Sequence, residues 1–392
     1  MQRMSMEMVN ATIMVGSELR HGSVAVHDGL ISGKSFQKQI DLTNYLVLPG
    51  IVDLHGDAFE HHLTPRPTSP FPISSCLSAT DADAASNGIT TAFMAHSWSW
   101  EGGYRSPDHA KSFLQSLADY KNEMRTDLRV QLRVETHTID TKEDLLKTLR
   151  EHNIEYIVLN NHLNEAIGAL EKDPAKLHFW AKQNGHSFEQ HVRNIKSATD
   201  QSDRVSRYLH DLTTALVDLS VIFGSHDDQD AETRNYFSMI GAKICEFPTS
   251  WSAAAAAYAK NEPIIMGAPN IVRGGSQAGN ISAIEVVNGL HCSALVSDYY
   301  YPTMSRAAFI LHEKAGLSLP DAWAKISTGP ANILGLNDRG RIELGKRADL
   351  TIVNKQTRNV EATICFGRIT FMAGEAANRF LGIKAIAGCA SE

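Results

Sequence analysis

The sequence has few cysteines, no long apolar run and no surplus of basic residues. Its 5 cysteines are far apart and form no Cys-x-x-Cys pair: Cys76, Cys245, Cys292, Cys365 and Cys389. This spacing argues against a disulfide framework or a zinc ribbon, and it is typical of a reducing compartment. With 44 Asp and Glu against 37 Lys and Arg, a broad nucleic-acid-binding surface is disfavoured, although a local basic pocket is compatible with these numbers.

The sequence leads us to expect neither a membrane span nor an export signal. The alanine-rich stretch WSAAAAAYAK is too short and too weakly apolar to span a bilayer. The N-terminal stretch MQRMSMEMVNATIMVG lacks the continuous apolar core of a signal peptide. We therefore expect a cytoplasmic protein with no membrane and no nucleic-acid partner, and we leave homo-oligomer formation open.

Short apolar runs alternate with longer stretches of helical periodicity through the middle of the 392-residue chain. This alternation predicts repeated βα units, and eight such units favour a TIM-like (β/α)8 barrel over residues 49–339, with an open doubly wound sheet as the alternative. The expected strands lie near Ile51–His55, Ile89–Ala95, Arg129–Glu135, Glu155–Asn160, Leu219–Ser225, Lys243–Phe247, Pro263–Ala268 and Ala294–Asp298.

Both ends of the chain carry short β-like segments. SVAVHDGLISG reads as two strands around an Asp28-Gly29 turn, and GRIELGKRADLTIVN and VEATICFGRITFMAG read as further strands near the other end. Neither end is large enough to bury a core alone. We therefore expect residues 1–48 and 340–392 to join into one small β-sandwich module.

Imidazole and carboxylate side chains follow five of the eight expected strands. In a parallel barrel the active site lies at the C-terminal ends of the strands, so these residues belong to one set. They are the ligands of a catalytic divalent metal that keeps an open position for water. We expect one or two divalent metal ions, zinc first and manganese or iron as alternatives. The candidate ligands are His55, Asp57, Glu135, His162, His226 and Asp298.

Each of these residues also has an ordinary interpretation. A single histidine among 17 is more often a surface or hydrogen-bonded residue than a ligand. The occurrence of six such residues at strand ends favours metal binding over the ordinary interpretation, because strand ends otherwise carry Gly, Ser or Asn. Asp227 and Asp228 either support His226 or cap the next helix. We assign no role to four further histidines near strand ends, His61, His62, His96 and His137.

The stretch MGAPNIVRGGSQAGN, residues 266–280, combines glycines with an arginine after an expected strand. Glycines let backbone N–H groups approach anionic oxygens, and the arginine fork matches phosphate, although a flexible surface loop has the same composition. The candidate phosphate-binding residues are Asn270, Arg273, Gly274, Gly275, Ser276 and also Arg66, which Pro65 and Pro67 flank and stiffen. Trp98, Trp100, Tyr299 and Tyr300 either shape a sugar pocket or belong to the core.

Several of these motifs carry a family resemblance. LPGIVDLHGD, the later His162, His226 and Asp298, and the segment GRIELGKRADLTIVN together resemble the amidohydrolase superfamily over nearly the whole chain. The resemblance implies a metal-dependent hydrolase with a barrel and a small β-module. Here His55-Gly56-Asp57 stands where the usual motif is His-x-His. The bridging lysine of many members has no evident counterpart, and Glu135 is the candidate substitute.

Other motifs narrow the resemblance to a diphosphatase family of the C-P lyase pathway for phosphonate use. They are TPRP, GITT, SHDD, EFPTS, MGAPNIVRGGSQAGN and SDYY. This resemblance implies hydrolysis of α-D-ribose 1-methylphosphonate 5-triphosphate, a phosphorylated small molecule, to the 5-phosphate and diphosphate. Asp298 would then bind the attacking water and take its proton, while Arg66 and Arg273 offset phosphate charge. The sequence departs from this family after His162 (NNHLNEA) and at Tyr301 (DYYYP).

Two other functions compete with this interpretation. The first is hydrolysis of a C–N bond by a deaminase, a cyclic amidase or a sugar-phosphate deacetylase, and the arginine-bearing glycine-rich loop disfavours it. The second is a metal-free interaction protein on the same fold. The presence of all six ligand-type residues speaks against this second function.

Overall fold

The computed structural model describes residues 5–66, 69–276, 278–290 and 292–383. Pro67, Cys389 and the last part of the expected end module lie outside the described residues. At the centre is a parallel sheet in the order β13-β12-β11-β10-β9-β8-β7-β6. Its strands are β6 (Ile51–Gly56), β7 (Ile89–Trp98), β8 (Asp127–Glu135), β9 (Tyr156–Asn160), β10 (Ile222–His226), β11 (Ile244–Glu246), β12 (Ile264–Gly267) and β13 (Ala294–Val296).

The central sheet closes into a barrel between its first and last strands. Gly56 forms a parallel bridge with Asp298. The N–H of Asp298 donates to the C=O of His55 at 3.0 Å, and the N–H of Asp57 donates to the C=O of Asp298 at 2.7 Å. The predicted TIM-like barrel is confirmed, and all eight expected strands are present. We call this β6/β13 junction the seam.

Side chains on neighbouring positions of a barrel strand enter different apolar clusters. In β9, Tyr156 and Val158 join one cluster, whereas Ile157 and Leu159 join the larger cluster that also contains the surrounding helices. This follows from the period of two along a strand, and burial on both faces explains why the strands read as nearly continuous apolar runs.

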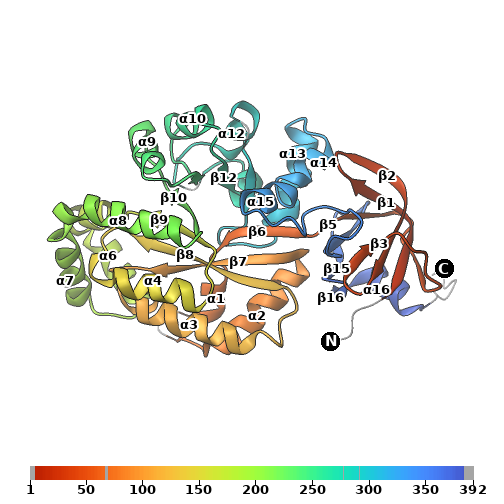
Figure 1. Ribbon diagram of the computed structural model, residues 1–392, viewed down its shortest axis with the longest axis horizontal. Helices are drawn as coiled ribbons and strands as arrows, with labels where there is room; N and C mark the ends of the chain where they lie inside the picture. The colour runs from red at the N-terminus through yellow and green to blue at the C-terminus, as the bar shows by residue number, and fades with distance from the viewer. Residues whose placement is uncertain (1–4, 67–68, 277, 291, 384–392) are drawn as a thin grey trace, which may run out of the picture.

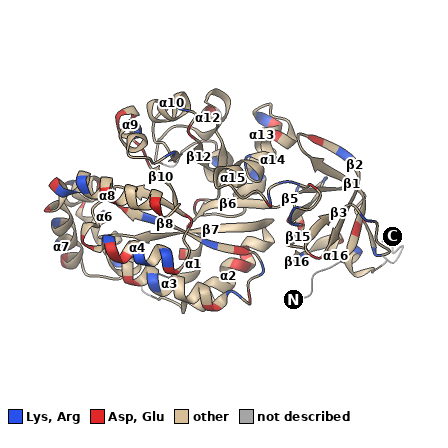
Figure 2. Ribbon diagram, in the orientation of Figure 1, with Lys and Arg blue, Asp and Glu red and all other residues tan. Residues whose placement is uncertain are grey.

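Helices connect and cover the barrel strands (Figure 1). They are α1 (Phe59–Leu63), α2 (Ile73–Ser86), α3 (Pro107–Tyr120), α4 (Lys142–Glu151), α8 (Val205–Asp218), α9 (Ala231–Met239), α10 (Trp251–Ala259), α11 (Ala268–Arg273), α12 (Ala283–Gly289), α13 (Thr303–Lys314), α14 (Leu319–Ala324) and α15 (Thr328–Ile333). Acidic and basic residues are interspersed on outer helices such as α9 and α13 (Figure 2). No described helix combines the length and apolar character that crossing a bilayer requires.

The connection between β9 and β10 carries three additional helices, α5 (Leu163–Lys172), α6 (Pro174–Gln183) and α7 (Phe188–Thr199). They pack around an apolar cluster of their own, which includes Leu163, Leu177 and Ile195. We call these helices the α5–α7 cap. Figure 1 shows α6 and α7 at the opposite end of the molecule from the second sheet.

The second sheet combines both ends of the chain, with strand order β16-β15-β14-β5-β1-β2-β3 and β4 paired to β1. The antiparallel pairing of β5 with β14 joins the two ends. Its elements are β1 (Met6–Val15), β2 (Glu18–His27), β3 (Leu30–Ser32), β4 (Gln39–Asp41), β5 (Tyr45–Pro49), β14 (Leu350–Asn354), β15 (Val360–Cys365), β16 (Arg368–Met372) and α16 (Gly374–Leu381). A small module built from both chain ends is confirmed. The boundaries at 48/49 and 339/340 remain predictions.

Candidate active site

Three of the expected ligands meet at the seam. His55, Asp57 and Asp298 place donor atoms within 4.8 Å of one another. Burial raises the pKa of Asp57 to about 7, and the charges of Glu60 and Asp298 act in the same direction. Burial also raises the pKa of Asp298. Asp57 and Asp298 are half-buried, and neighbouring carboxylates in such a place are stabilised in their charged form by a cation, so this donor set fits a divalent metal ion.

The glycine between His55 and Asp57 is required by close packing. A Cβ atom at Gly56 would lie 2.7 Å from the Oγ of Ser297 and 2.8 Å from Oδ2 of Asp53. Asp53 in turn accepts hydrogen bonds from the N–H (2.9 Å) and the hydroxyl (2.6 Å) of Ser297. These contacts fix the residue directly before Asp298, and the sequence analysis did not select Asp53 for this role.

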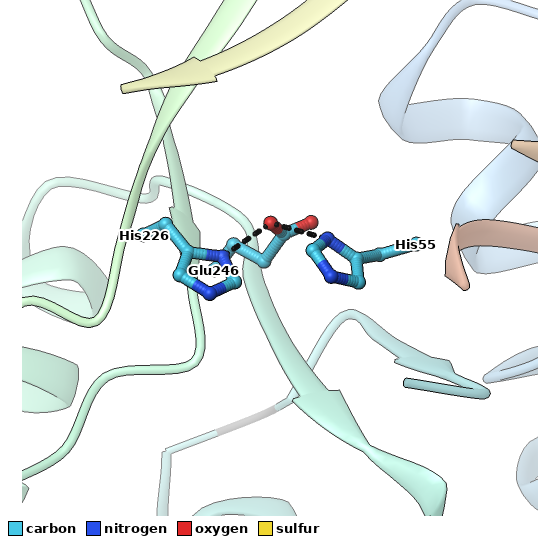
Figure 3. Close-up of side chains that lie close together, drawn as sticks. All are labelled: His55, His226 and Glu246. Carbon is cyan, nitrogen blue, oxygen red and sulfur yellow. Dashed lines mark hydrogen bonds and ion pairs between the residues drawn. The ribbon is translucent and has the colours of Figure 1, made fainter. Parts of the chain in front are cut away.

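Glu246, the last residue of β11, places its carboxylate between two of the expected ligands, His226 and His55 (Figure 3). Its Oε2 lies 2.9 Å from Nδ1 of His55 and 2.8 Å from Nδ1 of His226. The other carboxylate oxygen accepts from Gln131 at 3.0 Å. Burial would raise the pKa of Glu246, but the two histidines hold it well below its usual range. An ionised Glu246 therefore accepts a hydrogen bond from the protonated Nδ1 of each ring.

Because both rings donate to the same carboxylate, the orientation and the tautomer of each ring are fixed. A neutral histidine that donates from Nδ1 keeps a lone pair on Nε2, which is the arrangement of metal-binding histidines supported by a carboxylate. Burial lowers the pKa of His226. For His55 burial acts in the same direction, but the charge of Glu246 outweighs it and the net pKa is raised. The two rings stack with centroids 5.1 Å apart.

The remaining two expected ligands, Glu135 and His162, lie beside this group and bind each other. Nδ1 of His162 lies 2.7 Å from Oε1 of Glu135, and the backbone N–H of His162 donates to Oε2 at 3.1 Å. Burial would lower the pKa of His162, but Glu135 and Asp227 raise it to about 10. With Glu101, which the sequence analysis missed, they form a second group of donor atoms within 4.8 Å.

Asp227 stands between the two groups. Its Oδ2 lies 3.5 Å from Nε2 of His226 and 3.8 Å from Nε2 of His162. Asp227 and Asp298 adopt positive φ angles of 59° and 57°, as does Phe247 at 50°. Such conformations cost non-glycine residues on the order of 1–3 kcal/mol and cluster where function constrains the backbone. All three residues lie just beyond barrel strands, at the rim that carries the candidate ligands.

A cavity of about 340 Å³ joins the metal-type ligands to the glycine-rich loop. Its lining includes His55, Asp57, His226, Asp298, Asn270, Arg273, Gly275, Ser276 and Tyr299. The amide of Asn270 is engaged with the backbone of Ile281 and Ala283, so it shapes the loop. Gly274 ends α11 in the left-handed conformation (φ 81°). Arg66 is exposed and is not among the described residues that line this cavity.

A second cavity of about 230 Å³ lies between the barrel rim and the α5–α7 cap. It shares Asp57 and Arg133 with the first cavity, and it is also lined by His162, Glu101, Arg105, Trp100 and Trp180. Arg133 was not selected from the sequence. The two cavities therefore meet at the candidate ligands.

The other residues considered from the sequence are distributed over core, surface and site. Trp98 is fully buried and donates to Thr141, which places it in the core. Trp100 lines the second cavity and donates to Glu135 at 3.3 Å. Tyr300 is about half exposed. Asp228 binds Ser225 at 2.6 Å and Arg234 at 3.2 Å, both behind the rim.

Comparison with known proteins gives consistent results for sequence and fold. A model described as "Amidohydrolase family" matches residues 298–371. The chain is 27% identical over 367 residues, 90% of this chain and 96% of the relative, to α-D-ribose 1-methylphosphonate 5-triphosphate diphosphatase of Escherichia coli (strain K12).

Two solved structures show the fold. N-acetylglucosamine-6-phosphate deacetylase from Pasteurella multocida superposes with a TM-score of 0.63 at 13% identity, covering 93% of this chain and 99% of that one. β-Aspartyl dipeptidase from Fervidobacterium islandicum gives 0.60 at 16% identity, with 94% and 97% covered. The barrel, the module from both chain ends and the sequence similarity over nine tenths of the chain agree: the chain is similar in sequence and in fold to hydrolases of the amidohydrolase type.

Proposed function

We propose that this hydrolase cleaves a phosphoanhydride bond of a ribosyl triphosphate, converting α-D-ribose 1-methylphosphonate 5-triphosphate to the 5-phosphate and diphosphate. The observation that carries the proposal is the composition of the 340 Å³ cavity, where metal-type ligands and the arginine-bearing glycine-rich loop line one space. The relative from E. coli, whose name states this activity, supports the choice of substrate.

His55, Asp57, His226 and Asp298 would hold a divalent metal ion, zinc first, and Glu135 with His162 would hold a second one if two are bound. Such an ion lowers the pKa of bound water to about 7 and polarises a phosphoryl oxygen. The metal assignment rests on the half-buried carboxylates of Asp57 and Asp298 and on the two imidazoles whose Nδ1 atoms contact Glu246.

Side chains and backbone groups of the protein would take two roles in the reaction, proton acceptance and charge compensation. Asp298 faces the cavity and has a pKa raised by burial, so it suits a base that accepts the proton of the attacking water. Arg273 and the backbone around Gly275 offset the negative charge of the phosphate chain. Attack by water at the phosphorus next to the ribose breaks its bond to the bridging oxygen, which leaves with the diphosphate.

The test is product analysis with the purified chain in the presence of Zn²⁺ or Mn²⁺. The proposal requires stoichiometric diphosphate from the ribosyl triphosphate, measured by ³¹P NMR. A parallel assay follows ammonia and acetate release from amides, cyclic amides and N-acetylglucosamine 6-phosphate. Ammonia or acetate as the only product would replace this proposal by C–N bond hydrolysis on the same metal site.

A further inference from the structure

Two buried arginines near the barrel rim differ in how their donors are used. Arg234 is fully buried, and its Nη1 donates to Ser225 Oγ (2.7 Å), Ile244 O (3.1 Å) and Asp228 Oδ2 (3.2 Å). Its Nε makes no hydrogen bond to the described residues, as is also true of Arg133, but it lies 3.3 Å from a carboxylate oxygen of Glu262, with which it forms an ion pair. Arg234 is thus charge-compensated by protein groups alone, which is the arrangement of a structural residue.

Arg133, near the end of β8, is 9% exposed but has much weaker partners. Its Nη1 lies 3.6 Å from Oδ2 of Asp57, and its Nη2 lies 3.5 Å from Nε2 of His226. Its Nε has no hydrogen-bond partner among the described residues. A guanidinium has five N–H donors, and a buried one that leaves them under-used calls for another partner.

The position of Arg133 indicates what that partner is. Among the described residues, Arg133 and Asp57 are the two that line both cavities. If a divalent cation takes up the charge of Asp57, Arg133 is left as a buried cation that needs an anion. The cavity with Arg273 and Gly275 suits the phosphates that leave, whereas the cavity with Trp100 and Trp180 suits a sugar ring.

We propose that Arg133 binds the phosphoryl group next to the ribose, at the junction of the two cavities. This inference rests on the proposed function, and it adds a direction for the substrate. The leaving diphosphate lies in the 340 Å³ cavity and the ribosyl part lies in the 230 Å³ cavity under the α5–α7 cap. Arg133 thereby selects substrates in which the phosphorus that water attacks carries an anionic oxygen.

Two commercially available probes separate the two halves of the substrate. Ribose 5-phosphate stands in for the retained half and inorganic diphosphate for the leaving half. Calorimetric titration of the full-length, zinc-loaded protein should show that Arg133→Met weakens ribose 5-phosphate binding tenfold or more. Diphosphate binding should be affected less. Arg273→Ala, the matched control, should show the reverse pattern.

The variants also separate binding from folding. Arg133→Lys keeps the charge and should weaken ribose 5-phosphate binding severalfold, so it serves if Arg133→Met fails to fold. Zinc content, measured by mass spectrometry, should match wild type in both variants. Wild-type affinity for ribose 5-phosphate in the Arg133 variants, or a loss of zinc in place of a loss of affinity, would overturn the role of Arg133. A wild-type protein that binds neither probe would instead contradict the proposed function.

Discussion

Strand β8 carries charge at both of its ends, and the two ends use it differently. At its start, Asp127 lies 3.1 Å from Arg129 and 3.3 Å from Arg347, and it also pairs with Arg339. At its end, Arg133 faces the candidate site with only distant partners. In a barrel the end where the strands begin serves stability and the opposite end serves chemistry. The two ends of β8 therefore differ in whether neighbouring protein groups compensate the charge, and not in how much charge they carry.

The compensated end also joins the two parts of the fold. Arg339 and Arg347 belong to the segment that leads from the barrel helices into β14, and Arg347 pairs with Asp349 at 2.9 Å. The ion pairs around Asp127 therefore attach the end module to the base of β8. If the two ends differ in this way, substitutions at the rim should affect metal affinity, substrate binding and kcat. Substitutions at the base of β8 should affect the free energy of unfolding.

The largest expected effect is at Asp298. Asp298→Asn removes the proposed proton acceptor, and kcat should fall by about 10²- to 10⁴-fold. Because the change also removes one charge from the half-buried pair of Asp57 and Asp298, the metal-free variant should unfold at the same urea concentration as wild type or a higher one. Steady-state kinetics and urea denaturation check both statements. A destabilised variant with normal kcat would place Asp298 among the structural residues.

The next effect concerns Glu246, which contacts His55 and His226 and is not among the described residues that line either cavity. Glu246→Gln keeps the shape but removes the charge that both Nδ1 atoms contact, so zinc affinity should fall about 10- to 100-fold. Competition with a fluorescent chelator measures this affinity. Asp228→Asn, a nearby buried carboxylate that binds Arg234, is the control and should leave zinc affinity within a few fold of wild type.

Arg273 tests the phosphate side of the rim. Arg273→Ala should lower kcat/KM for a ribosyl triphosphate roughly tenfold to a hundredfold, because one charge-assisted contact of about 1.5–3 kcal/mol is lost. Zinc content should not change, and Arg273→Lys should recover only part of the loss. Equal kcat/KM for the alanine variant and wild type on every phosphorylated substrate would remove Arg273 from the site.

The smallest effect is expected at the base of β8 and is pH-dependent. Burial would raise the pKa of Asp127, but Arg129 and Arg339 lower it to about 2 from 3.8. Because the folded-state pKa is the lower one, this stabilisation is present above about pH 4 and is lost as the pH falls toward 2. Asp127→Asn should therefore cost about 2 kcal/mol at neutral pH and less in acid. Urea denaturation of wild type and variant, at neutral pH and in acid, measures this difference in the free energy of unfolding. The zinc affinity of the variant should equal that of wild type.

The sequence predicted the barrel because its strands are buried on both faces and are therefore visible as apolar runs. The six ligand-type residues could be chosen because polar side chains at the ends of such runs are conspicuous. Their division into a group at the seam and the pair Glu135 and His162 could not be predicted, since it depends on how far each strand extends over the rim.

Among the residues that were not selected from the sequence, Glu246 and Arg133 were missed for different reasons. Glu246 ends β11, which has only three residues, and a glutamate at the end of so short a run reads as an ordinary boundary. Arg133 was overlooked although a signal exists. Gln131, Arg133 and Glu135 alternate with Leu132 and Val134, so all three polar side chains point to the same face of β8. An alternating polar triplet in a strand expected to be buried indicates a polar barrel interior.

The seam has a consequence for how the protein matures. Asp53 and Ser297, which support its two sides, are 244 residues apart in the sequence. The hydrogen bonds that join His55, Asp57 and Asp298 close the barrel between its first and last strands, and contacts of such long sequence separation slow folding because of the chain entropy lost on closure. The donor atoms of His55, Asp57 and Asp298 come together where β6 meets β13, so binding of a metal ion there should report a closed barrel.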